Sequence, residues 1–208
     1  MFTGSASLLL LLLLVLVFFA ALIYVGVRYG NQSWAAVEKG TGSSRLWSRL
    51  NVRGDPADLL YGVPKDFSWS EVGGLVKNAN DETVGRLVRG TLAVSLEAGG
   101  TPYRLVTQPT RGLRVNLLPS SQETPVCSFV ATSGLPRPSG TYSGPQISPL
   151  RVRRASLWRK DCTIWRDGVM IGSLRLVHVG GVQVKALLLP PEVPLEVHLF
   201  VLWAADGS

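Results

Sequence analysis

The sequence predicts a single N-terminal transmembrane helix followed by a mainly β domain with a short helical preface. Three observations support this fold class: an uncharged apolar run over 8–27, a two-residue apolar–polar alternation from Thr91 onwards, and turn residues between the alternating runs. The β domain, 91–208, is expected to form an antiparallel sandwich, a jelly roll or a small barrel of about eight strands.

Residues 8–27 have no charged side chain, and they follow a tail, 1–7, that also lacks charge. A run of roughly 20 apolar residues has the length needed to span the hydrocarbon core of a bilayer as a helix. A cleaved secretory signal is the main alternative, but such signals have a basic start and a shorter apolar region. The sequence therefore favours an uncleaved signal-anchor, and an extracytoplasmic β domain behind a signal peptide remains the alternative.

Flanking charge predicts the orientation of this segment. No basic residue precedes the run, whereas five follow it at Arg28, Lys39, Arg45, Arg49 and Arg53. Because Lys and Arg are enriched in cytoplasmic loops, we expect a single-pass membrane protein whose C-terminal domain lies on the cytoplasmic side.

The segment 28–54 is predicted to be a juxtamembrane tether with one short helix near Ser44–Leu50, since it is rich in Gly, Ser, Asn and Gln. The segment 55–90 is the predicted helical preface. Asp55 followed by Pro56 is typical of a helix start, and Ser68 and Glu71 have the spacing of a capping box. Glycines interrupt each apolar face, so we expect little stable helix here.

Several runs in 91–208 alternate as strands do, among them Leu113–Leu117. Gly180-Gly181 predicts a hairpin turn. The cleanest alternation, Val193–Trp203, predicts a central strand. Proline, glycine and serine dominate 132–149, which is therefore predicted to be a loop.

The net charge is +7, and most of the positive charge lies in one part of the chain. Residues 99–160 contain nine basic side chains and one acidic side chain, Glu123. Arginine outnumbers lysine sixteen to five, which favours bidentate contact with carboxylate or phosphate. The densest stretch predicts a site for an anionic partner at Arg151, Arg153, Arg154, Trp158, Arg159 and Lys160. Ser156 lies in an Arg-Arg-Ala-Ser pattern and is a candidate phosphorylation site.

No catalytic residues, cofactor site or metal site are predicted. The chain has no Gly-x-Ser-x-Gly, no P-loop and no His-Glu-x-x-His motif. Cys127, Cys162, His178 and His198 lack the short spacing of zinc ligands. The two cysteines are expected to be buried thiols, with one disulfide as the alternative for an extracytoplasmic domain.

These features predict a non-catalytic assembly, scaffold or matrix-type protein that presents a basic interaction domain at a membrane surface. The expected partners are the membrane that the helix spans and either a protein or anionic lipid. A membrane-tethered nucleic-acid-binding accessory protein is the alternative, because arginines interleaved with tryptophans can contact phosphates and stack on bases.

Overall fold

A computed structural model describes most of the chain. The described residues are 12–24, 42–50, 54–67, 71–90, 94–109, 113–132, 139–154, 161–179 and 182–204. Within strands and helices a few of their side chains are not described, namely those of residues 45, 64–67, 71–73, 89, 90, 109, 178, 179, 182, 183 and 204.

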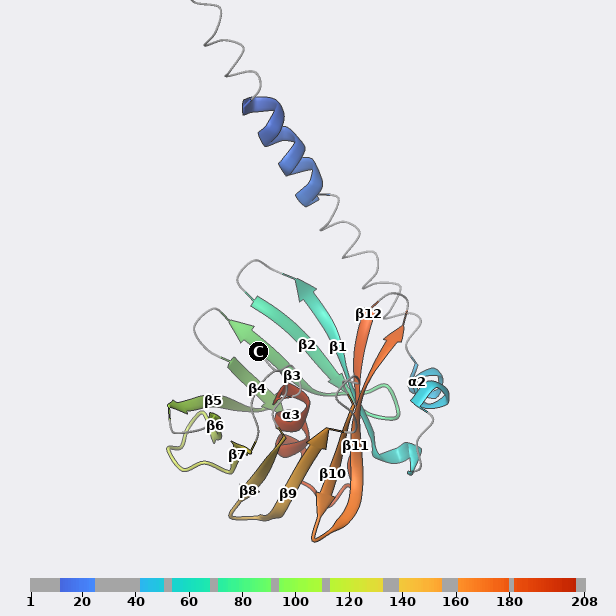
Figure 1. The fold of residues 1–208 in the computed structure, drawn as a ribbon, viewed down its shortest axis with the longest axis vertical. Helices are drawn as coiled ribbons and strands as arrows, with labels where there is room; N and C mark the ends of the chain where they lie inside the picture. Colours follow the sequence, from blue (N-terminus) through green and yellow to red (C-terminus); the bar gives the residue numbers. More distant parts are fainter. Residues whose placement is uncertain are drawn as a thin grey trace, which may run out of the picture.

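The described residues form a closed, antiparallel barrel of twelve strands (Figure 1). Each strand pairs with the next one along the chain, and β1 pairs with β12 to close the ring. The strands are β1 (Leu59–Phe67), β2 (Glu71–Lys77), β3 (Thr83–Gly90), β4 (Val94–Ala98), β5 (Thr101–Pro109), β6 (Leu113–Pro119), β7 (Cys127–Ala131), β8 (Gly140–Gly144), β9 (Ile147–Arg154), β10 (Cys162–Arg166), β11 (Val169–Val179) and β12 (Val182–Leu188). The prediction of a β domain of about eight strands, built as an antiparallel sandwich, a jelly roll or a small barrel, is therefore wrong.

Part of the difference lies in the predicted helical preface, which contains β1, β2 and β3. Asp55 does cap a helical turn, because its side chain accepts a hydrogen bond from the Ala57 amide, but that turn is only the 3-10 helix η1 (Pro56–Asp58). The segment that suggested a second helix forms β2 instead, where Val76 faces the core and pairs with Gly62 and Gly85. Pairing on both sides of β2 outweighs a weak local helix signal.

The run Val193–Trp203, predicted as a central strand, forms helix α3 (Leu195–Ala204) and lies inside the ring of strands (Figure 1). The side chains of Val197, Leu199, Phe200, Val201 and Leu202 are each at most 1 % exposed. A helix that is apolar on nearly all faces must be buried away from water. The barrel wall provides that environment, since α3 contacts β3, β4 and β12.

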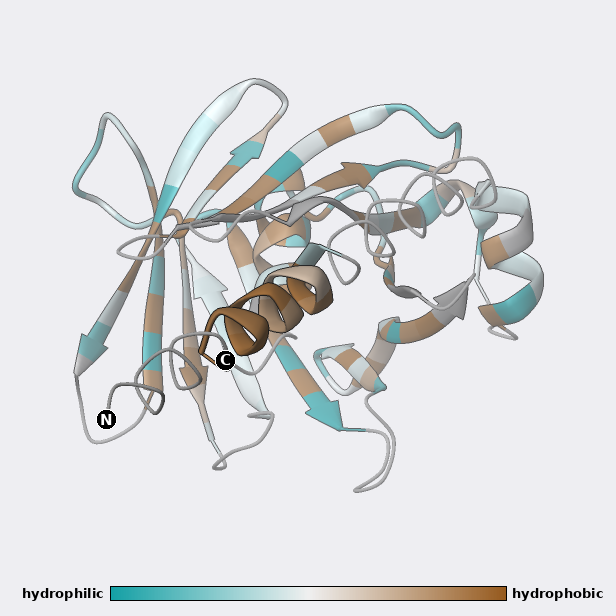
Figure 2. Cartoon of the chain, turned by 90° about the horizontal axis from the view of Figure 1, so that it is seen from above, coloured by the Kyte–Doolittle hydropathy of each residue, from teal (hydrophilic) through white to brown (hydrophobic). Residues whose placement is uncertain are grey.

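The barrel has a hydrophobic core inside and a smaller one outside. Inward-facing side chains of the strands pack on α3, and the alternation of apolar and polar residues is visible as colour bands along the strands in Figure 2. The amino group of Lys185 on β12 donates a hydrogen bond of 3.1 Å to the carbonyl of Leu202, near the end of α3.

Outside the barrel, helix α2 (Ser43–Leu50) contacts β11, and its Leu46 and Leu50 belong to one buried cluster with Tyr61 of β1 and Ala186 of β12. The predicted short helix near Ser44–Leu50 is thus confirmed, but it lies against the wall of the barrel.

Residues 12–24 are helical. Among the described residues, no helix has the length and apolar character required to cross a membrane. The predicted transmembrane helix over 8–27, the signal-anchor and the single-pass localisation with a cytoplasmic domain are therefore corrected. Residues 8–11 and 25–27 of that prediction lie outside the described residues.

Candidate interaction surface

Five residues form one row across the outside of the barrel, from β6 to β10. Register pairs link Arg114 to Val130, Val130 to Thr141, Thr141 to Arg151 and Arg151 to Trp165. Residues that pair directly across strands lie on the same face of a sheet. At about 4.8 Å between strands, the row covers about 19 Å of surface. We call it the arginine row.

Alternation along each strand explains why these residues face outward. Their chain neighbours Val115, Phe129, Tyr142, Leu150 and Ile164 are at most 2 % exposed and belong to the inner core. Because successive side chains of a strand point to opposite faces, the residues of the row face solvent when these neighbours face the core. Arg114 and Arg151 are exposed, and Val130 is 40 % exposed.

Trp165 is held in place at one end of the row. Its indole Nε1 donates a hydrogen bond of 2.9 Å to the Thr163 hydroxyl, which fixes the ring against β10. The Arg153 guanidinium carbon lies 5.7 Å from the centre of the same ring, within the range of a cation–π contact. This contact places a third arginine beside the row.

The charge on this face is of one sign. Strands β5 to β9 contain arginines but no aspartate or glutamate. Glu123 lies in the turn between β6 and β7, and Glu97 lies on β4. The arginines of the row therefore face solvent on a part of the wall whose strands supply no neutralising carboxylate.

Only some of the residues predicted to bind an anionic partner lie together. Arg151 and Arg153 are on the outer face of β9, but Arg154 is the next residue and faces the other way. Arg154 pairs with the buried Cys162, and its Nε is buried without a hydrogen-bond partner among the described residues. Trp158, Arg159, Lys160 and the candidate phosphorylation site Ser156 lie outside the described residues.

Sequence reasoning missed Arg114 and Val130 as members of this surface. They are 37 and 21 residues away from Arg151 in the chain and come next to it only through the pairing register. A register is set by pairing across strands and is not readable from the composition of one stretch.

The titratable side chains of Cys127, Tyr142 and His198 are buried inside the barrel. Burial raises the pKa of the Cys127 thiol to about 12, and burial raises the pKa of Tyr142 far above its ordinary value. His198 is buried in α3, where its Nδ1 and Nε2 lie 3.0 and 3.3 Å from the carbonyls of Pro194 and Leu189. The described part of the chain contains no cluster of three or more His, Cys, Asp or Glu residues suited to a metal ion.

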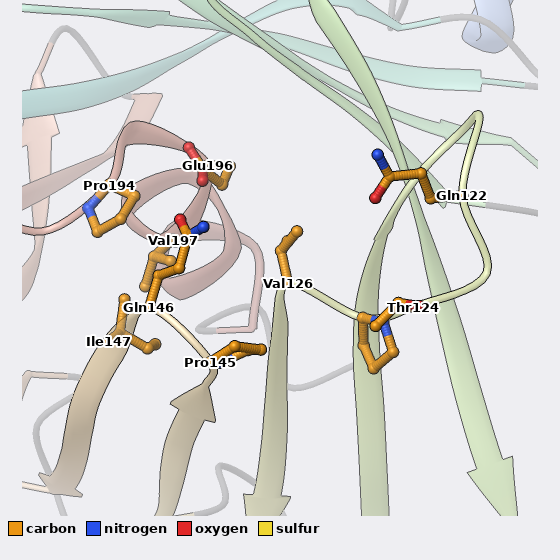
Figure 3. Close-up of a pocket in the computed structure, with 10 residues that line it drawn as sticks. Gln122, Thr124, Val126, Pro145, Gln146, Ile147, Pro194, Glu196 and Val197 are labelled. Atoms are coloured by element: carbon orange, nitrogen blue, oxygen red, sulfur yellow. The ribbon is translucent and has the colours of Figure 1, made fainter.

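Two cavities lie near the first turn of α3. One, of about 480 Å³, is lined by Arg86 and Glu97, which pair across β3 and β4 and offset each other in charge. The other, of about 180 Å³, is formed by the β6–β7 turn, the β8–β9 turn and the start of α3 (Figure 3). Among the described residues that line it, Glu196 is the only one with a charged side chain.

Comparison with protein-family models, with curated proteins and with solved structures found no match for this chain.

Proposed function

We propose that this chain is a non-catalytic interaction protein whose barrel binds an acidic protein partner through the arginine row. The observation that carries the proposal is the order of side chains in the row, in which Arg114 and Arg151 flank Val130 and Thr141 and end on Trp165. Met170 pairs with Trp165 and is 50 % exposed, so it extends the row onto β11. Arginine, tryptophan and methionine are enriched at protein–protein interfaces.

Closure of the barrel limits how a partner can bind. A closed ring has no edge strand to which a peptide could add a strand. Recognition on this wall must therefore come from side chains. Two arginines separated by an aliphatic centre match a partner surface that has carboxylates around an apolar contact.

An acidic protein fits this surface better than a nucleic acid does. Binding of single-stranded nucleic acid depends on aromatic rings that are open to stacking bases. The ring of Trp165 is only partly exposed and already carries the Arg153 guanidinium. The centre of the row, Val130 and Thr141, offers no ring at all.

The test uses the full-length protein and two fluorescent probes, polyglutamate and a single-stranded oligothymidylate, with fluorescence anisotropy as the measurement. We expect polyglutamate to bind more tightly than the oligonucleotide. The double variant Arg114→Gln/Arg151→Gln should lose about tenfold in affinity for polyglutamate, since exposed charge pairs contribute up to about 1 kcal/mol each. Arg86→Gln removes an exposed arginine on β3, away from the row, and should change the affinity by less than about twofold.

If Arg86→Gln lowers the affinity for polyglutamate as much per charge removed as the double variant does, binding depends only on the net charge of the protein. That result would contradict the proposal. Tighter binding of the oligonucleotide, with loss in the double variant, would assign the arginine row to nucleic acid instead.

A further inference from the structure

The smaller cavity brings together three segments that are far apart in the sequence. Gln122 and Val126 come from the turn between β6 and β7, Gln146 from the turn between β8 and β9, and Glu196 and Val197 from the first turn of α3. Figure 3 shows these side chains around a common space, with Val126 at its centre and Gln146 next to the helix. At about 180 Å³ the cavity lies below the roughly 300–1,000 Å³ of pockets that hold drug-sized ligands. Its size suits one side chain.

The walls of the cavity are fixed by backbone contacts. The Val126 amide donates a hydrogen bond of 2.9 Å to the Leu117 carbonyl, and the Val197 amide donates one of 3.0 Å to the Pro194 carbonyl. Gly144 packs so closely on the Val126 carbonyl that no side chain would fit between β8 and β7 at that point. A cavity with fixed walls needs little ordering when a ligand enters.

The lining combines an apolar wall with one negative charge. Val126, Ile147 and Val197 offer aliphatic surface, and prolines at 125, 145 and 194 add more. The Glu196 carboxylate and the Gln146 amide lie on the helix side of the cavity (Figure 3). An aliphatic wall that ends at a carboxylate is complementary to a side chain with an alkyl stem and a cationic head, which is the chemistry of lysine and arginine.

The carboxylate also affects its buried neighbours. Burial raises the pKa of Tyr103, and the negative charge of Glu196 raises it further. The same charge adds to the effect of burial on Cys127. An acidic residue in the first turn of a helix is favourable in itself, but that role does not require the apolar cavity beside it. Arg104 reaches the other side of the β6–β7 turn, where it donates a hydrogen bond of 3.4 Å to the Gln122 carbonyl, and it does not line the cavity.

We propose that this cavity binds one basic side chain, lysine or arginine, of a protein partner, with its alkyl stem on Val126 and Ile147 and its cationic head at the Glu196 carboxylate. The cavity is at the end of the strands where β8 turns into β9, and it shares no residue with the arginine row. Either surface can therefore bind without the other.

The test is a titration of the full-length protein, labelled at its methyl groups, with blocked amino acids followed by NMR. N-acetyl-lysine amide and N-acetyl-arginine amide carry the cationic heads, and the amides of N-acetyl-norleucine and N-acetyl-citrulline are neutral counterparts. We expect saturable shifts of the Val126, Ile147 and Val197 methyl signals with the two cationic probes, and an affinity at least about tenfold weaker for the neutral ones.

Three variants separate the cavity from a general charge effect. Glu196→Gln should weaken binding of the lysine probe about tenfold, because it keeps the size of the side chain and removes its charge. Gln146→Trp should fill the cavity from an exposed turn and abolish the shifts while Glu196 remains. Glu123→Gln, an exposed carboxylate on the β6–β7 turn that does not line the cavity, should leave the affinity within about twofold.

Equal affinity for norleucine and lysine, equal loss in Glu123→Gln and Glu196→Gln, or no methyl shifts up to the solubility limit of the cationic probes would each overturn the proposal. The outcome with polyglutamate does not affect this result, because that probe tests the arginine row alone.

Discussion

The hydroxyl of Tyr61 donates a hydrogen bond of 2.6 Å to Oδ1 of the Asp81 carboxylate. The same carboxylate oxygen accepts a hydrogen bond of 2.9 Å from the Ser43 amide. Tyr61 is on β1, Asp81 is in the turn between β2 and β3, and Ser43 is the first residue of α2. One carboxylate thus connects the outer helix to the wall of the barrel. Asp81 does so from a left-handed backbone conformation, with φ of 64°.

The first prediction concerns pH. Partial burial alone raises the pKa of Asp81, but the hydrogen bonds from Tyr61 and Ser43 and the charge of Lys77 outweigh it, so the pKa lies below its ordinary value. A carboxyl whose pKa is lower in the folded state than the usual value of about 3.9 stabilises the fold above that pH. The stabilisation is lost as the pH falls through the folded-state pKa. Asp81→Asn should therefore be less stable than the wild type at pH 7, and the difference should shrink below about pH 4.

The measurement is the free energy of unfolding by urea from pH 3 to pH 8. Tyr61→Phe removes the donor, and a double-mutant cycle with Asp81→Asn should give a coupling energy of about 1 kcal/mol at pH 7. A difference between wild type and Asp81→Asn that stays constant over the whole pH range would contradict the structural assignment of this carboxylate.

The second prediction concerns the helix inside the barrel. Phe200 is fully buried, and its ring meets the ring of Tyr142 edge-on, with centroids 5.2 Å apart. Phe200→Ala should lower the free energy of unfolding by about 3–5 kcal/mol, because it removes a buried ring and leaves a cavity. Val169→Ala, at a side chain that is 64 % exposed, should change it by less than about 0.5 kcal/mol. Similar small losses in both variants would show that α3 does not pack inside the barrel.

The third prediction compares Gly85 on β3 with Gly62 on β1, two glycines that both pair with Val76 of β2. A Cβ at Gly85 would collide with the side chain of Leu199 on α3 and would lie 2.6 Å from the Glu97 carbonyl. Gly85→Ala should therefore destabilise the fold by about 1–3 kcal/mol, as overpacking does.

Gly62→Ala is the matched control, because a Cβ there would lie 4.0 Å from the nearest atom, the Lys185 Cβ, which is an ordinary contact. It should be neutral or stabilising by up to about 1 kcal/mol, since alanine restricts the unfolded chain. Thermal unfolding of both variants is a sufficient measurement, and equal effects would argue against a helix seated on β3.

The fourth prediction concerns the cysteines. Both thiols are buried, and the raised pKa of Cys127 leaves almost no thiolate at pH 8. Because the thiolate is the reactive form, Ellman's reagent should react with neither cysteine in the folded protein and with both in guanidinium chloride. Rapid reaction of one thiol under native conditions would show that the inner core is open at that position.

Several strands could be predicted from the sequence because apolar and polar residues alternate along them, as they do in a sheet with one buried face. The run Leu113–Leu117 matches β6, and the segments beside Gly180-Gly181 match β11 and β12. Asp167-Gly168 joins β10 to β11 with φ of 52° and 82°, and an Asp-Gly pair between two apolar runs is a local signal for such a turn. These signals are local, so a single stretch of sequence contains them.

Other elements depend on contacts that no single stretch contains. Val193–Trp203 alternates, yet Leu199–Leu202 is continuously apolar, and only the presence of an enclosing barrel decides in favour of a helix. The segment 132–149, predicted as a loop, contains β8 and the start of β9. Its Gly140 and Gly144 suggested a break in structure, but each lies where a Cβ would collide with β7.

The same distinction between local signals and long-range contacts applies to the arginine row. The concentration of arginine in 99–160 is visible in the sequence, whereas the register that places Arg114 beside Arg151 is not. The predicted set at 151–160 also assumed that consecutive basic residues act together. The two-residue period of β9 separates Arg153 from Arg154 instead.

The seam between β1 and β12 also determines when this protein can fold. It joins Leu59–Gly62 to Lys185–Leu188, and α3, which fills the ring, is encoded after both. A ribosome therefore produces all twelve strands of the wall before it produces α3, the helix that occupies the interior. The barrel can close around its core only after β12 and α3 have both been made, and until then the inner faces of its strands must be kept from other hydrophobic surfaces in the cell.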